Sequence, residues 1–228
     1  ETEARLGRQY IVLDNQRWVG NFPWRQRHAT FEAAGITTGV LGGLDVYYGY
    51  VDRFNTPIRT SLDSRSHLLN VSHDVPGWGR LSGYGYYVDL TESDRLSCFT
   101  SGLRFVGERR LADELDLLYE VEVAHQVDAA DNPDDRDATY FLVDVGARHR
   151  GARYTLGVEV LGGDGTPGGA IQAPFGRKVY FNGWANVFAL TPDTGLRDVS
   201  AKVVLPLREL EVELQAHDFR ADSGGARY

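Results

Sequence analysis

The 228-residue chain predicts an all-β fold, an antiparallel up-and-down sheet of about eleven strands. Two observations lead to this prediction. Apolar and polar residues alternate with a period of two over long stretches, as they do in strands whose two faces meet different surroundings. The connections between these stretches alternate between short and long. No stretch shows a helical periodicity of comparable quality, so the whole chain, 1–228, is expected to form one β domain.

The clearest alternation lies at 115–127. One side of this stretch carries Leu115, Leu117, Tyr119, Val121, Val123 and His125. The other side carries Asp116, Glu120, Glu122, Ala124 and Gln126, and Leu118 is the exception. The same pattern recurs at 141–149, 153–160 and 209–216, and Leu44, Val46, Tyr48 and Tyr50 follow it earlier in the chain. These stretches are predicted to be half-polar strands.

In chain order, strands are predicted at 5–13, 28–37, 41–53, 66–75, 79–90, 97–108, 113–126, 139–149, 151–161, 197–206 and 208–219. The short connections lie near Gly39, at 76–78, 109–112 and 150–152, and at Pro206-Leu207. The longer ones lie at 14–27, 54–65, 91–96, 128–138 and 162–196. An up-and-down sheet places alternate connections at opposite ends, so one end is expected to carry tight turns and the other long loops.

Tight turns at one end and long loops at the other are typical of outer-membrane transmembrane β-barrels, whose strands need about 9–11 residues to cross. In such a barrel the apolar face meets lipid and the polar face lines water. A soluble β-sandwich or jelly roll that binds or cleaves polysaccharide is the alternative, and it would bury the apolar face in a core. The surroundings of Leu115, Leu117, Tyr119, Val121 and Val123 distinguish the two.

Composition narrows the function classes further. A net charge of −8 gives a nucleic-acid partner no electrostatic support. Cys98 is the single cysteine, which excludes an internal disulfide and a cysteine metal cluster. The six histidines have no metal-ligand spacing, and no serine has a histidine and an acid placed for nucleophilic catalysis. The acidic run 128–137 lacks the spacing of a calcium loop and is interpreted as a solvated loop. Neither enzymatic activity nor a cofactor is therefore expected.

The stretch LDNQRWVGNFPWRQ, residues 13–26, is aromatic and cationic where a loop is normally small and polar. In a barrel it can fold into the lumen. Arg17, Arg25 and Arg27 would then present cations to the pore, and Trp18 and Trp24 would stack on sugar rings or anchor the loop. Arg104, Arg148 and Arg153 would extend the cationic track along the inner face. The alternative is that these arginines pair with lumen carboxylates such as Glu120, Glu122, Asp144 and Glu159.

Several segments resemble the alginate export outer-membrane porin family. They are GRQYIVLDNQRWVGNFPWRQRHATFEA (7–33), EVLGGDG (159–165), FNGWANVFALTPDTGLRDVSAKVVLP (181–206) and HDFRAD (217–222). The resemblance implies an outer-membrane barrel of about eighteen strands that passes anionic solutes, uronic-acid sugars or alginate among them, with membrane lipid around it. Eleven strands are fewer and odd in number, so the chain is expected to be an internal part of a longer barrel, incomplete at both ends and open as it stands.

Overall fold

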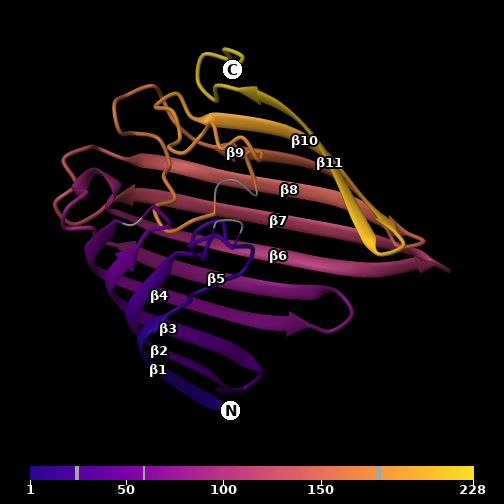
Figure 1. The fold of residues 1–228 in the computed structure, drawn as a ribbon, viewed down its shortest axis with the longest axis horizontal. Helices are drawn as coiled ribbons and strands as arrows, with labels where there is room; N and C mark the ends of the chain where they lie inside the picture. Colours follow the sequence, from indigo (N-terminus) through magenta and orange to yellow (C-terminus); the bar gives the residue numbers. More distant parts are fainter. Residues whose placement is uncertain (24–25, 59, 178–180) are drawn as a thin grey trace.

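The computed structural model describes residues 1–23, 26–58, 60–177 and 181–228, with 40 and 41 described by backbone only. These residues form one antiparallel sheet whose strands follow chain order, as Figure 1 shows. The strands are β1 (Thr2–Gln9), β2 (Thr30–Leu41), β3 (Leu44–Asn55), β4 (Ser61–Val75), β5 (Gly79–Val88), β6 (Cys98–Ala112), β7 (Leu115–Asp128), β8 (Asp137–His149), β9 (Ala152–Leu161), β10 (Leu196–Leu207) and β11 (Leu210–Arg220). A 3₁₀ turn, η1 (Asp94–Leu96), lies between β5 and β6.

The predicted all-β, up-and-down fold is confirmed, and the sheet is open. Among the described residues, β1 pairs along its length only with β2 and β11 only with β10. No helix in the described part of the chain is long and apolar enough to cross a membrane.

The connections at one end of the sheet are short turns, at 42–43, 76–78, 113–114, 150–151 and 208–209. Gly42 and Gly43 have φ angles of 61° and 86°, the two positive values that a type I′ hairpin turn requires. The connections at the other end span 10–29, 56–60, 89–97, 129–136 and 162–195, and Figure 1 shows them gathered there. The predicted alternation of turns and loops is therefore present.

Several predicted boundaries were wrong. The turns expected near Gly39, at 109–112 and at Pro206-Leu207 lie inside β2, β6 and β10, because these strands stay paired with their neighbours for a few residues more than predicted. The first strand was expected at 5–13, but β1 ends at Gln9, and the apolar run that follows leaves the sheet to bury Ile11 in the core. The loop expected at 54–65 is only 56–60. Strand β4 begins at Ser61, because its first residues pair with the end of β3, where Arg53 Nε lies 2.8 Å from Asp63 Oδ1.

The apolar face of the sheet is exposed. On β7 the exposed fractions of Val121 and Val123 are 40% and 45%. In register with Val123 are Leu103 on β6 and Phe141 on β8, which are 56% and 41% exposed. A sandwich would cover this face with a second sheet. The exposure of this face fits the barrel and excludes a sandwich core here.

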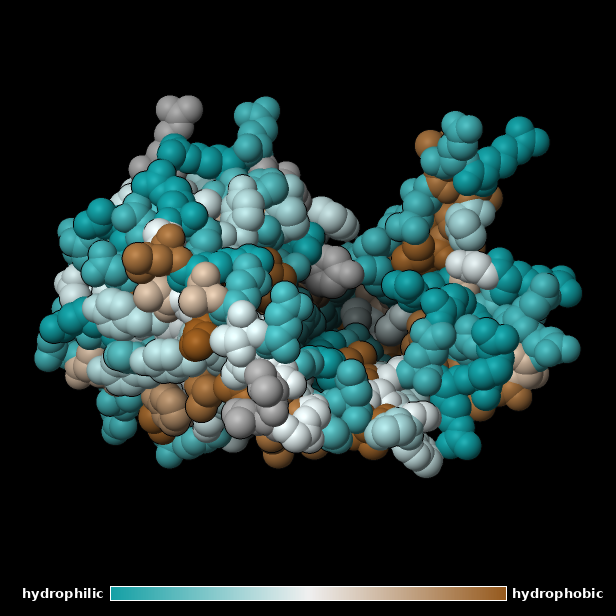
Figure 2. Space-filling model, turned by 90° about the horizontal axis from the view of Figure 1, so that it is seen from below, coloured by the Kyte–Doolittle hydropathy of each residue, from teal (hydrophilic) through white to brown (hydrophobic). Residues whose placement is uncertain are grey.

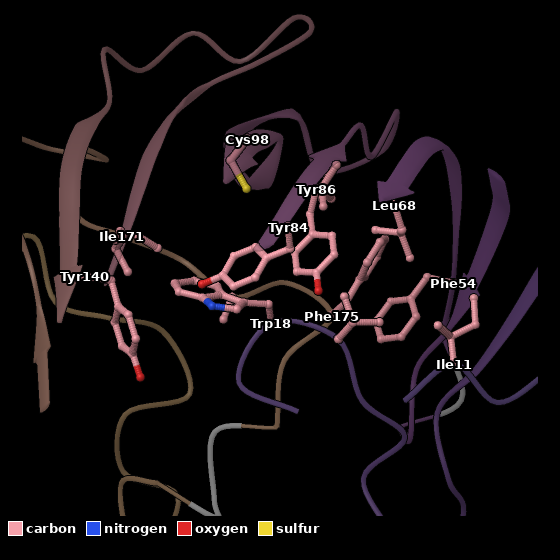
Figure 3. Close-up of a cluster of buried hydrophobic side chains, with 14 of the residues drawn as sticks. Ile11, Trp18, Phe54, Leu68, Tyr84, Tyr86, Cys98, Tyr140, Ile171 and Phe175 are labelled. Carbon is pink, nitrogen blue, oxygen red and sulfur yellow. The ribbon is translucent and has the colours of Figure 1, made fainter. Parts of the chain in front are cut away.

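The buried core instead lies on the opposite face, between the sheet and the long connections that fold over it. Figure 3 shows Trp18 between Tyr140 and Tyr84, with ring centroids 4.9 and 6.4 Å away. Phe175, from the connection 162–195, packs on Phe54 of β3 at 4.8 Å. Two connections far apart in the sequence thus pack together against one face of the sheet.

Candidate functional site

The candidate site is the face of the sheet that the long connections cover, called here the inner face. Strand pairing places Glu120 opposite Asp144, and it aligns Glu122 with Leu142 and then with Glu159 on the next strand. Because side chains of a strand alternate between faces, residues directly opposite each other share a face. The carboxylates that alternation predicted to share a face therefore form neighbouring rows on the inner face.

The segment 10–20 leaves β1 and lies against this face. Asp14 and Gln16 have positive φ angles of 48° and 67°, which fold the segment back on itself. The Asn15 side-chain oxygen accepts a hydrogen bond from the Arg17 backbone N–H at 3.0 Å. Further on, the Gly20 N–H donates to the Phe175 carbonyl at 2.9 Å, which joins this segment to the connection 162–195. Because the segment folds back in this way, the side chains of Arg17 and Trp18 point toward the strands of the inner face, called here the wall.

Arg17 is buried rather than presented to the lumen, with 1% of its surface exposed. Its Nε lies 3.0 Å from Glu159 Oε1, and its Nη2 donates to the Asn182 side-chain oxygen at 3.3 Å. The guanidinium also lies 4.8 Å from the Phe181 ring centroid. The expectation of a pore-facing Arg17 is corrected: the inner-wall carboxylate neutralises this cation, as the alternative interpretation had it.

Trp18 is buried as well. Its indole Nε1 donates to Glu122 Oε1 at 2.7 Å, and the Tyr84 hydroxyl donates to the same oxygen at 2.6 Å. Stacking on a solute sugar ring is not open to this side chain, because both of its ring neighbours are wall tyrosines. Of the two roles considered for Trp18, the structure shows the anchoring one.

Of the other loop residues considered, Trp24 and Arg25 lie outside the described residues. Arg27 is exposed. It lines a hollow of about 510 Å³ whose other walls are Arg8, Tyr10, Gln26, His28, Thr30, Asn55 and Ser61. This hollow is at the loop end of β1, β2 and β3, away from Arg17.

Arg104 projects from β6 onto the inner face and is 8% exposed. Its Nε lies 2.8 Å from Glu120 Oε1, and its Nη1 lies 3.8 Å from Asp14. It lines a hollow of about 660 Å³ together with five further charged residues, Glu3, Arg5, Asp14, Asp45 and Arg80. Figure 2 shows the molecule hollowed near its middle, with hydrophilic residues around the opening.

Arg148 and Arg153 stand directly opposite each other on β8 and β9. Arg148 contacts Glu108, and its Nε lies 3.2 Å from Asp116 Oδ2. Arg153 is exposed and lines a third hollow, of about 470 Å³, with Glu120, Asp144 and Lys202 among its other lining residues. The two arginines therefore lie together near the short-turn end of the sheet, apart from Arg17.

The structure adds residues that sequence reasoning did not single out. Arg80 of β5 lines the same hollow as Arg104, and its Nη2 lies 2.5 Å from Asp45 on β3. Its position two residues before Ser82, which pairs with Arg104, is the signal that could have placed it on the inner face. Asn182 gave no such signal, because its contact with Glu159 depends on the path of a long connection.

Within the described ranges, no group of three or more His, Cys, Asp or Glu side chains is placed to hold a metal ion. In the acidic connection 129–136, contacts from arginines hold the chain in place. Arg95 contacts Asp134, and the buried Arg136 donates from its Nε to the Gly168 carbonyl at 3.1 Å.

Comparisons with known proteins give fold but not family. No protein-family model matches the chain, and no curated protein matches it. Among solved structures, Pseudomonas aeruginosa OpdL is 15% identical with a TM-score of 0.74, covering 99% of this chain and 64% of that one. Acinetobacter baumannii OccAB2 is 14% identical with a TM-score of 0.77, covering 99% and 60%. P. aeruginosa OccK10 (OpdN) is 13% identical with a TM-score of 0.76, and the match covers 99% of this chain and 66% of that one.

These three structures are outer-membrane porins of Gram-negative bacteria. At such low identity the likeness establishes the fold, which is that of part of an outer-membrane porin barrel. The chain spans less than two thirds of the length of each of these porins.

Proposed function

We propose that this chain forms part of an outer-membrane porin, in which small solutes diffuse through a water-filled lumen without any covalent step. The observation that carries the proposal is the inverted arrangement of the sheet. Apolar side chains such as Val123 are exposed on one face, while carboxylates and arginines occupy the face that the long connections cover. That arrangement suits a wall between lipid and water.

The two inward connections support a narrowed passage rather than a wide tube. Segment 10–20 and the connection 162–195 pack together on the inner face, and charged residues surround the hollows of about 660 and 470 Å³ beside them. A solute crossing the lumen would pass these charged walls. Fixed charges in a narrow, low-dielectric passage discriminate among ions and charged solutes.

For the solute we propose an anionic class, with uronic-acid sugars or alginate chains as candidates. Support comes from the inner-face arginines whose side chains are partly or fully exposed, namely Arg153 and Arg80, the second of which is 36% exposed and also pairs with Asp45 and Asp74. Planar guanidinium forks match carboxylates in geometry. The resemblance of 7–33 and 181–206 to the alginate export porin family supplies the uronate candidate.

The test is the reversal potential of the full-length protein in a planar bilayer under a potassium chloride gradient. We expect a stable conductance with anion preference. A cation-selective conductance would leave the channel standing and overturn the anionic class, making carboxylates such as Asp144 and Glu120 dominant. A full-length protein that stays soluble without detergent and gives no conductance would overturn the porin itself.

A further inference from the structure

Two buried glutamates on the inner face hold both inward connections. Glu122 Oε1 accepts hydrogen bonds from Trp18 and from Tyr84, and its Oε2 accepts one from the Asn15 side-chain amide at 3.0 Å. Only 1% of Glu122 is exposed. Of these donors, Trp18 and Asn15 belong to segment 10–20 and Tyr84 belongs to the wall.

Glu159, which lies on β9 as Glu122 lies on β7, is hydrogen-bonded in a similar way. Its Oε1 accepts from the Tyr140 hydroxyl at 2.8 Å and lies 3.0 Å from Arg17 Nε. Its Oε2 accepts from the Asn182 amide at 2.8 Å, and 5% of the residue is exposed. Arg17 comes from segment 10–20 and Asn182 from the connection 162–195. This single carboxylate therefore joins both connections to the wall.

A buried carboxylate is costly unless it is paired and hydrogen-bonded. Among the described residues, the strands donate one hydroxyl hydrogen bond to each glutamate, from Tyr84 or Tyr140, and Arg104 of β6 lies 4.0 Å from Glu122. The connections supply the other hydrogen-bond donors and the cation nearest Glu159. Lifting the connections would leave both carboxylates short of partners in a poorly hydrated site. The charge on the wall therefore opposes any movement of the connections into the lumen.

We propose that Glu122 and Glu159 are positioning residues that hold the two connections as one fixed constriction, and that Glu159 also sets selectivity by neutralising Arg17. The proposal rests on the porin function argued above. On this proposal, the positive charge of Arg17 contributes to the electrostatic potential of the lumen only when Glu159 is uncharged.

The experiment compares Glu159→Gln and Glu122→Gln with Glu211→Gln in the full-length protein. Glu211 lies on the inner face of β11 opposite Pro206. Among the described residues, no hydrogen bond or ion pair joins Glu211 to either inward connection, so its substitution removes an inner-face charge without freeing a connection. A glutamine at 122 or 159 presents amide hydrogens to donors. We expect single-channel conductance to rise by roughly 1.5-fold or more, with flicker, in both test variants and to stay at the parent value in the control.

The ion selectivity of the variants shows whether Glu159 also neutralises Arg17 or only holds the connections in place. Glu159→Gln should raise anion preference, because Arg17 keeps its charge, whereas the double variant Arg17→Gln with Glu159→Gln should lose that rise and keep the higher conductance. Equal conductance and equal selectivity in the parent and in both single variants would overturn the proposal.

Hydrogen exchange of the detergent-solubilised protein tests whether Glu122 and Glu159 hold the connections, and it needs no current measurement. In both test variants, amides of 13–20 should exchange about tenfold faster than in the parent and the Glu211→Gln control, as expected when one strong buried interaction is lost. Unchanged exchange there would also overturn the proposal. If the parent carries no current but its test variants exchange faster, the porin function is overturned, while the holding of the connections by Glu122 and Glu159 is supported.

Discussion

Arg17 and Glu159 form a buried ion pair, with the guanidinium Nε 3.0 Å from a carboxylate oxygen and side chains only 1% and 5% exposed. The pair joins a connection that follows the first strand to a wall residue of the ninth. An arginine that the sequence suggested as a pore cation is thus part of the packing on the inner face of the sheet.

Removing this arginine should destabilise the protein. Arg17→Gln leaves the buried Glu159 without its cation, and breaking one side of a buried pair typically costs about 3–5 kcal/mol. Urea unfolding of the full-length protein in detergent measures the loss. Arg150→Gln is the matched control, because Arg150 pairs with Glu114 in an exposed turn and should change stability by less than about 1 kcal/mol. Equal effects at both positions would contradict the buried role of Arg17.

Arg153, an exposed cation of the inner face, should contribute to selectivity instead. Arg153→Gln is expected to lower the anion-to-cation permeability ratio by roughly twofold at 0.1 M salt, since Arg153 lines an open hollow. The effect should shrink at 1 M salt, where screening extends only about 3 Å. Reversal potentials in planar bilayers check both values, with Arg150→Gln as the turn control. A ratio unchanged at low salt would remove Arg153 from the solute path.

The close packing of the two inward connections predicts a glycine requirement at 176. A Cβ at Gly176 would lie 2.0 Å from the Arg17 backbone oxygen, so Gly176→Ala must push the connections apart. We expect a loss of about 1–3 kcal/mol in unfolding free energy, as overpacking generally costs. Gly85→Ala is the control, because its Cβ would meet only Phe99 at 3.6 Å, an ordinary contact. Equal unfolding midpoints for the two variants would contradict the packing described.

The lipid-facing assignment predicts an asymmetry between the faces of the sheet. Val123→Arg should cost about 2–4 kcal/mol of stability in vesicles, the range for a cation facing lipid near the middle of a membrane. Thr155→Arg, on the inner face beside Lys202, should cost clearly less. Folding titrations into phospholipid vesicles measure both, and a larger loss for the inner-face variant would reverse the assignment of the faces.

Much of the fold could be predicted because alternation is a local property. The alternation from Leu115 to Gln126 predicts a strand and its two faces without reference to any other residue. The first tight turn was expected near Gly39, too early in the chain, because Gly42 and Gly43, which form it, were included in the strand 41–53. The end of β1 could not be predicted in this way. Tyr10 to Leu13 have strand-like composition, and only the core beneath segment 10–20 draws Ile11 out of the sheet.

The site was predicted less completely, because the sequence shows which face a residue occupies and not which partner reaches it. Alternation placed Arg104, Arg148 and Arg153 on one face with Glu122 and Glu159, and strand register agrees. It could not show that Trp18 meets Glu122, since that contact depends on how segment 10–20 folds back.

The sequence alone therefore determined where most of each strand lies, its two faces and which connections are long, because the alternation of apolar and polar residues is repeated within each strand. Only the tertiary structure decided the state of Arg17. Whether its charge is free or neutralised depends on Glu159, which Arg17 meets only when segment 10–20 folds onto the sheet, and Asn182 from the connection 162–195 accepts a further hydrogen bond from it.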